Sequence, residues 1–160
     1  MAKHDALTLT LQGVADTVRL GTMLASSTPD GTTIGFTGTL GAGKTRLIQA
    51  LAVANGVEEG SVTSPTYVLC HIYHGSRLIY HIDAYRLADS DEFLELGVDE
   101  MFESAGLTLV EWADRVEDVL PNRRLNIDLQ ITSKSERRAT IAGHEDFFPL
   151  LTAIADSWTA

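Results

Sequence analysis

The eight residues Gly38–Thr45, GTLGAGKT, have the composition and spacing of a loop that holds the phosphates of a nucleotide. In such a loop, backbone N–H groups point inward and meet the positive end of a helix. Lys44 supplies a positive charge to the β- and γ-phosphates, and the Thr45 hydroxyl reaches a Mg²⁺ ion. The residues predicted to bind the nucleotide here are Gly38, Thr39, Leu40, Gly41, Ala42, Gly43, Lys44 and Thr45.

The segments on both sides of this loop match what a phosphate loop needs. Residues Thr32–Thr37 (TTIGFT) are β-branched and apolar, which favours a central strand. Residues 44–55 (KTRLIQALAVAN) place apolar side chains on one face of a helix, and Gly56 closes it. A phosphate loop sits between a strand and a helix, so this context separates the motif from an ordinary glycine-rich turn.

A second ligand for Mg²⁺ usually comes from an acid at the end of a neighbouring strand, and two acids compete for this role. Glu111 ends the apolar run LTLV, which is typical of a buried parallel strand. Asp83 ends the segment RLIYHID, whose alternating pattern suggests a strand nearer the periphery of the sheet. Glu111 has the better strand, although either acid could also be a surface carboxylate at a strand end.

Between these regions lies the segment Val62–Tyr67, VTSPTY, in which Pro65 stiffens a loop rich in hydroxyl groups. Loops in this chain position sense the γ-phosphate through a hydroxyl group near Mg²⁺ in several nucleotide switches. A Ser-Pro turn that enters a strand explains the same residues equally well. The residue types leave both interpretations open.

Strand-like and helix-like segments interleave along the rest of the chain, which contains no repeat and no linker. The length of 160 residues suits one domain, so residues 1–160 are predicted to form a single P-loop domain. The predicted fold is α/β, with a P-loop NTPase-like, mixed and mostly parallel sheet, helices on both faces and an inserted β-hairpin. Further strands are expected at Leu7–Leu11, Thr66–Tyr73, Arg77–Asp83, Leu107–Trp112, Arg124–Thr132 and Arg137–Ala142. Further helices are expected at 14–25, 113–120 and 147–158, and one or two short helices within 88–106.

The composition indicates in which compartment the protein works and which class of partner it binds. No apolar run is long enough to cross a bilayer, the first residues lack the apolar core of a signal peptide, and Cys70 is the only cysteine, so a cytoplasmic protein is expected. The formal net charge is −10, with 12 basic residues against 22 acidic ones. A protein that binds an RNA or DNA backbone normally has a basic face, so direct, high-affinity nucleic-acid binding by this chain alone is not expected. The acidic balance instead suits docking to a basic partner protein.

Several motifs follow one another in a specific order: GTLGAGKT, VTSPTY, YHIDAYRL, ELG and LTLVEWADR. Together they resemble the TsaE (YjeE) family of bacterial P-loop ATPases, over roughly residues Val14–Ile131. The resemblance implies a protein that binds ATP/ADP and Mg²⁺, hydrolyses ATP slowly and acts in forming N6-threonylcarbamoyladenosine in tRNA. It also implies a complex with TsaD and TsaB homologues, in which TsaD carries the transfer chemistry and the ATPase resets the complex. The isolated chain is expected to be a monomer.

The resemblance also assigns roles to individual residues of the reaction. It implies Thr45 and Glu111 as the Mg²⁺ ligands. It implies Asp83 as a carboxylate at the active site that aligns water or the metal shell. Lys44, Asp83 and Glu111 are therefore the predicted catalytic residues.

Around this centre the resemblance adds residues that bind the nucleotide or a partner. It implies Thr66 as the hydroxyl group of the switch-like loop and Trp112 as a residue at the nucleotide or partner face. Arg86 is expected to be structural or to lie at the partner surface. The adenine is expected between Val14 and Ala15 at the start of the first helix and the turn at Ser133–Ser135, with Ser135 as its contact.

Two other functions remain open from the sequence. A small-molecule or nucleoside kinase would need an arginine-bearing lid, whereas the arginine candidates Arg123, Arg124, Arg137 and Arg138 flank expected strands. A nucleotide-dependent scaffold would bind ATP without hydrolysing it. Fold alone does not choose among these functions.

Overall fold

The computed structural model describes residues 5–62 and 69–159. The strands are β1 (Ala6–Leu11), β2 (Thr33–Thr37), β3 (Cys70–His74), β4 (Leu78–Asp83), β5 (Leu107–Glu111), β6 (Arg124–Ile131) and β7 (Arg137–Gly143). The α-helices are α1 (Val14–Ser27), α2 (Lys44–Ala54), α3 (Ser90–Leu94), α4 (Val98–Glu103) and α5 (Phe148–Thr159), and the 3₁₀ helices are η1 (Ala113–Val119) and η2 (Glu145–Phe147). None of these helices is both long enough and apolar enough to span a membrane.

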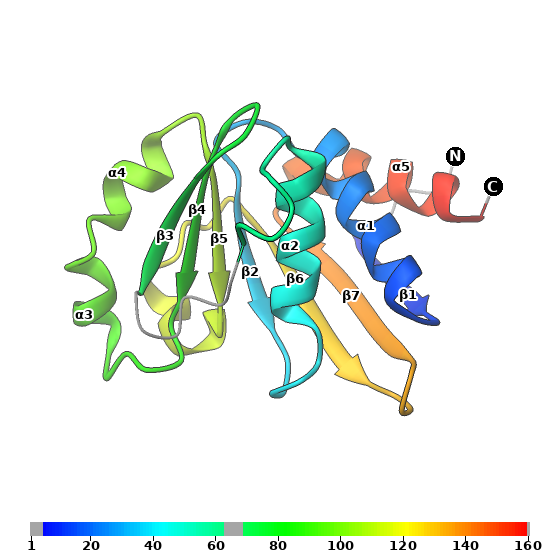
Figure 1. Cartoon of the computed structure of the whole chain (residues 1–160). Helices are drawn as coiled ribbons and strands as arrows, with labels where there is room; N and C mark the ends of the chain where they lie inside the picture. The colour runs from blue at the N-terminus through cyan, green and yellow to red at the C-terminus, as the bar shows by residue number, and fades with distance from the viewer. Residues whose placement is uncertain (1–4, 63–68, 160) are drawn as a thin grey trace.

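The seven strands form one sheet in the order β1-β7-β6-β2-β5-β4-β3 (Figure 1). The central strands β6, β2, β5 and β4 are parallel, whereas β3, β7 and β1 join their neighbours antiparallel. Strands β3 and β4 form the predicted hairpin. The prediction of an α/β fold with a mixed sheet built around parallel strands is therefore confirmed.

Helices cover both faces of this sheet. One core joins the sheet to α1, α2 and α5, and a second, smaller core joins it to α3, α4 and η1. Figure 1 shows α1 and α2 together on one side and α3 and α4 on the other. Strand β5 is buried at every position because helices pack on both of its faces, which is why its sequence is a continuous apolar run.

Strand β4 lies nearer the periphery of the sheet than β5, as its alternating pattern suggested, but it is not an edge strand. Strand β3 pairs with its outer edge, so β4 lies inside the sheet next to β5. The carboxylate-bearing residue Asp83 at its end is only 9% exposed. Asp83 is therefore buried although β4 is second from the edge of the sheet, because the predicted hairpin partner β3 covers the outer edge of β4.

Of the two helical segments after β4 and β5, the first agrees with the prediction of one or two short helices, whereas the second departs from the predicted α-helix. The region 88–106 contains two short helices, separated at Gly97, whose φ is +80°. Asp89 caps the first of them, because its Oδ1 accepts a hydrogen bond from the backbone N–H of Glu92 at 3.0 Å. The segment 113–120 forms a 3₁₀ helix with an irregular residue at Val116 rather than an α-helix.

Arg77 lies in the turn between β3 and β4, at the end of the sheet away from the phosphate loop. It connects this turn to the C-terminal ends of α1 and α2. Its guanidinium donates hydrogen bonds to the carbonyl oxygens of Thr28 and Ala25, to Asn55 Oδ1 and to Asp30 Oδ1, at 2.7 to 3.0 Å. We predict that Arg77→Ala lowers the free energy of unfolding by about 2–3 kcal/mol, because it leaves part-buried acceptors unpaired. Urea unfolding would measure this change.

The matched control is Asp30→Asn, which removes only the ion-pair charge of a side chain that is 69% exposed. An exposed ion pair is worth at most about 1 kcal/mol, so this variant should stay close to the wild type. Equal losses in the two variants would show that the ion pair, rather than the hydrogen-bonded turn, stabilises this end of the sheet.

Candidate functional site

The phosphate loop follows β2 directly and ends at the first turn of α2, at the carboxyl end of the parallel strands. Gly38 and Gly43 have φ values of +137° and +106°, a region that residues with a Cβ atom rarely adopt. A Cβ atom on Gly38 would lie 2.3 Å from the carbonyl oxygen of Leu129. The loop therefore needs glycine at these positions, and it leads into the N-terminus of α2, where backbone N–H groups can face an anion.

Lys44 is almost fully buried beneath this loop, with 5% of its surface exposed. Its Nζ donates hydrogen bonds to the carbonyl oxygens of Gly38 at 2.6 Å and Thr39 at 3.1 Å. The ammonium group also lies 4.0 Å from the centroid of the Trp112 ring. Burial lowers the pKa of Lys44, and the nearby carboxylates, Glu111 first among them, partly oppose that shift. The Lys44 ammonium group thus lies beneath the loop with little access to water.

Glu111 ends β5 directly beside the start of α2. Its Oε1 accepts a hydrogen bond from the Thr45 hydroxyl at 2.8 Å, and the residue is only 3% exposed. Asp83 is the register partner of Glu111 on the parallel neighbour β4, so the two carboxylates lie side by side. Lys44 lies close enough to interact electrostatically with both acids. The structure therefore places all three predicted catalytic residues, Lys44, Asp83 and Glu111, in one site.

The environment of Asp83 disfavours its ionised form. Burial raises the pKa of Asp83, and the neighbouring charge of Glu111 adds to the increase. The hydrogen bond from the backbone N–H of Tyr85 to Asp83 Oδ1, at 2.9 Å, acts in the opposite direction. A carboxylate with a raised pKa at the rim of a cavity is suited to exchange a proton with water.

The oxygen atoms of Thr45 and Glu111 suit a Mg²⁺ ion. Both are hard ligands, and their separation of 2.8 Å lets them occupy neighbouring positions around one cation. Within residues 5–62 and 69–159, no group of three or more His, Cys, Asp or Glu side chains is placed to hold a metal ion. This donor set fits a Mg²⁺ ion that brings most of its ligands with it, as water and phosphate oxygens.

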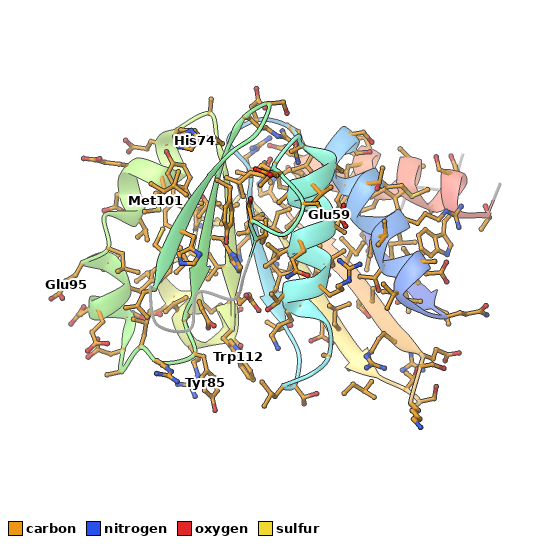
Figure 2. The ribbon with its side chains drawn as sticks, in the orientation of Figure 1. Glu59, His74, Tyr85, Glu95, Met101 and Trp112 are labelled. Carbon is orange, nitrogen blue, oxygen red and sulfur yellow. The ribbon has the colours of Figure 1, made fainter. Side chains whose placement is uncertain are left out.

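A cavity of about 320 Å³ opens over these residues on one side of the phosphate loop. Trp112 and Tyr85 line it, with ring centroids 4.8 Å apart, and Figure 2 shows both at the same end of the molecule. Trp112 has a left-handed backbone with φ +57°, the only such value for a non-glycine residue in the described chain. Its role at the nucleotide or partner face stays a prediction. The full lining is Leu40, Gly41, Gly43, Lys44, Thr45, Arg46, Asp83, Tyr85, Arg86, Glu111 and Trp112.

A second cavity, of about 330 Å³, lies across the loop from the first and shares Gly43 and Arg46 with it. It brings together Val14 at the start of α1 and Ser135 in the β6–β7 turn, two of the residues that the resemblance implies for the adenine. Ala15 is exposed and does not line this cavity. The full lining is Gly13, Val14, Thr17, Ala42, Gly43, Arg46, Lys134, Ser135 and Arg137.

Sequence reasoning missed the positive charges of the second cavity. Arg46, Lys134 and Arg137 line it, and the Arg137 guanidinium comes within 3.4 Å of the Gly41 carbonyl oxygen. Arg137 had been interpreted only as a residue flanking a strand. The β6–β7 turn carries it to the phosphate loop, and no local pattern signals that approach. Thr66, the predicted switch residue, lies outside the described residues.

Sequence reasoning also missed His81, which is completely buried and touches Glu111. One local signal could have found it: His81 precedes Asp83 by two residues on the same strand, and alternate residues of a strand share one face. The face that carries Asp83 therefore also carries His81.

Comparisons with known proteins identify the family of this chain. The model of one family, described as threonylcarbamoyl adenosine biosynthesis protein TsaE, matches residues 11–139. The chain is 36% identical over 127 residues to the tRNA threonylcarbamoyladenosine biosynthesis protein TsaE of Treponema pallidum, covering 79% of this chain and 93% of the relative. It is 34% identical over 137 residues to the Bacillus subtilis protein of the same name, with 85% of each chain covered.

A solved structure shows the same fold. The crystal structure of Bacillus subtilis YdiB superposes with a TM-score of 0.78 over 97% of each chain, at 26% sequence identity. The matched segment 11–139 contains the phosphate loop, both carboxylates and the β6–β7 turn. The chain therefore belongs to the TsaE family.

Proposed function

We propose that this protein binds ATP with Mg²⁺, hydrolyses it slowly, and acts on a complex of TsaD and TsaB homologues during formation of N6-threonylcarbamoyladenosine in tRNA. The observation that carries the proposal is the hydrogen bond between Thr45 and Glu111 at the foot of the phosphate loop. It joins the first helical turn after the loop to the acid of the neighbouring strand, which is the pairing that phosphoryl-transfer sites use to hold Mg²⁺.

The two cavities divide the nucleotide between them. The phosphates are assigned to the first cavity, which contains Lys44 and the two carboxylates, and the nucleoside to the second. Arg46, Lys134 and Arg137 line the second cavity, and none of its described lining residues is a carboxylate. These positive charges would attract the phosphates of a nucleotide at the boundary between the two cavities.

Hydrolysis in this arrangement depends mainly on positioning and charge. A bound Mg²⁺ would neutralise charge on the phosphate oxygens. Lys44 and the loop N–H groups orient the phosphates, and Asp83 lies where it can align a water molecule and accept its proton. Leu40, at the tip of the loop, is 81% exposed and Tyr85 is 47% exposed, so the rim of the site is uncovered in the isolated chain. Slow turnover without a partner follows from that exposure.

Nucleotide binding can be tested through Trp112. Because its ring packs on the Lys44 ammonium, Mg·ATP should change its fluorescence. The change should persist in Trp158→Phe, disappear in Trp112→Phe, and be lost together with binding in Lys44→Ala. Absence of both a fluorescence change and calorimetric binding up to about 1 mM ATP, the upper end of ordinary KM values, would contradict the proposal.

The same preparation tests the accessory role. We expect release of ADP and phosphate that rises about 10-fold or more when TsaD and TsaB homologues are added, because a partner would complete the open rim. Phosphate transfer to a nucleoside or metabolite would instead identify a kinase. Tight, salt-sensitive binding of tRNA by the isolated chain would contradict the expectation, drawn from the net charge of −10, that the protein docks to a protein.

A further inference from the structure

His81 is a fully buried polar residue that the proposed reaction does not use. It lies on β4, on the sheet face that packs against α2, and its exposed fraction is 0%. Its Nε2 is 2.6 Å from Glu111 Oε2, while Glu111 Oε1 accepts the Thr45 hydroxyl at 2.8 Å. Each oxygen of the Glu111 carboxylate therefore has its own partner on a different element of the fold.

The imidazole is itself held from its other side. His81 Nδ1 lies 3.5 Å from the Tyr73 hydroxyl, which lies 3.1 Å from His71 Nδ1. Tyr73 is buried on β3, the strand that pairs with β4. A continuous series of polar side chains thus runs from Thr45 through Glu111 and His81 into the β3–β4 hairpin, and it restricts the rotation of the His81 ring.

The terminal torsion of a glutamate side chain is broad, so a carboxylate without fixed partners samples many orientations. A buried carboxylate also needs hydrogen bonds to remain stable away from water. The bond to His81 meets both needs, because it satisfies Oε2 and leaves the Oε1 edge facing Thr45. Metal-binding carboxylates are commonly oriented in this way, and loss of such a partner lowers metal affinity about 10- to 100-fold.

We propose that His81 is a positioning residue that orients Glu111 for Mg²⁺ and presents a single carboxylate oxygen to the cation. This inference rests on the proposed Mg²⁺ site at Thr45 and Glu111. It assigns the β3–β4 hairpin a part in metal affinity, although its described residues other than Asp83 do not line the phosphate cavity.

The test compares His81→Leu with His81→Gln and His74→Leu. Glutamine keeps an N–H donor of similar reach, whereas leucine removes it. His74→Leu makes the same substitution at an exposed site on β3, and Figure 2 shows His74 at the opposite end of the sheet from Trp112. Each variant is titrated with Mg²⁺ at fixed ATP, using the heat of binding, and with ADP in excess chelator.

We expect His81→Leu to need about 10- to 100-fold more Mg²⁺ than the wild type for half-maximal binding, with metal-free ADP affinity unchanged within about 2-fold. His81→Gln should recover most of the loss, and His74→Leu should match the wild type. This split between metal-dependent and metal-free binding distinguishes positioning from a general loss of structure.

Two results would overturn the inference. One is an unchanged Mg²⁺ requirement in His81→Leu while Glu111→Gln raises it, which would leave the proposed function intact. The other is an equal loss of metal-free ADP affinity and of thermal stability in both His81 variants, which would make His81 a structural residue only. If the wild type itself shows no Mg²⁺ dependence, the proposed metal site fails and this inference fails with it.

Discussion

Replacing Glu111 with glutamine should lower the rate of ATP hydrolysis by about 100-fold or more, while ADP binding without metal changes little. Glutamine keeps the size of the side chain and can still accept the hydrogen bond from Thr45, but it loses the negative charge that would bind Mg²⁺. The measurement is steady-state phosphate release at saturating ATP across a range of Mg²⁺ concentrations.

Glu103→Gln is the matched control, because Glu103 is an exposed acid on α4 and does not line either nucleotide cavity. It should hydrolyse ATP at the wild-type rate. If Glu111→Gln retained more than about a tenth of the wild-type rate, the assignment of Glu111 as the metal ligand would be wrong.

Replacing Asp83 with asparagine should have two opposite effects. Hydrolysis should fall by about 100-fold or more, because asparagine cannot accept a proton from the attacking water. The nucleotide-free protein should nevertheless become more stable at pH 7. Its asparagine oxygen can still accept the Tyr85 N–H, and the buried charge beside Glu111 is gone.

The pH dependence follows from the raised pKa of Asp83. Between the ordinary carboxyl pKa and the raised one, the folded protein binds more protons at this site than the unfolded chain does. Stability contributed by the site therefore falls as the pH rises through this window, and stays lower above it. The stability gained by Asp83→Asn should be full at neutral pH and disappear below the ordinary carboxyl pKa.

Thermal unfolding of the wild type and Asp83→Asn between about pH 3 and pH 8 would measure this difference. Asp99→Asn, at an exposed position on α4, is the control and should show no such dependence. A variant that is inactive and also less stable at neutral pH would mean that Asp83 holds the fold together rather than carrying a disfavoured charge for the reaction.

The local features of the fold could be predicted from the sequence because they depend on neighbours along the chain. The spacing of Gly38–Thr45 between an apolar strand and a helical pattern was enough to place the phosphate loop at the start of α2. The continuous apolar run before Glu111 was enough to identify a central strand, since burial on both faces removes alternation.

The arrangement around the two acids was decided only by the tertiary structure. From the sequence, Glu111 and Asp83 were competing strand ends, and the register of β4 against β5 makes them neighbours in one site. The same register, together with the hairpin partner β3, buries His81 against Glu111. A pattern of period two gives the face on which a side chain lies, but it does not give the strand that will be paired beside it.

Contacts between segments that are distant in the sequence were likewise decided by the tertiary structure. The resemblance to relatives suggested Val14 and Ser135 for the adenine, but it did not indicate that Arg137 would approach the loop at Gly41. The sequence by itself determined the elements, the phosphate loop and the candidate acids. The order and register of the strands decided which of those residues meet, because side-chain contacts across a sheet depend on pairings that no local stretch of chain encodes.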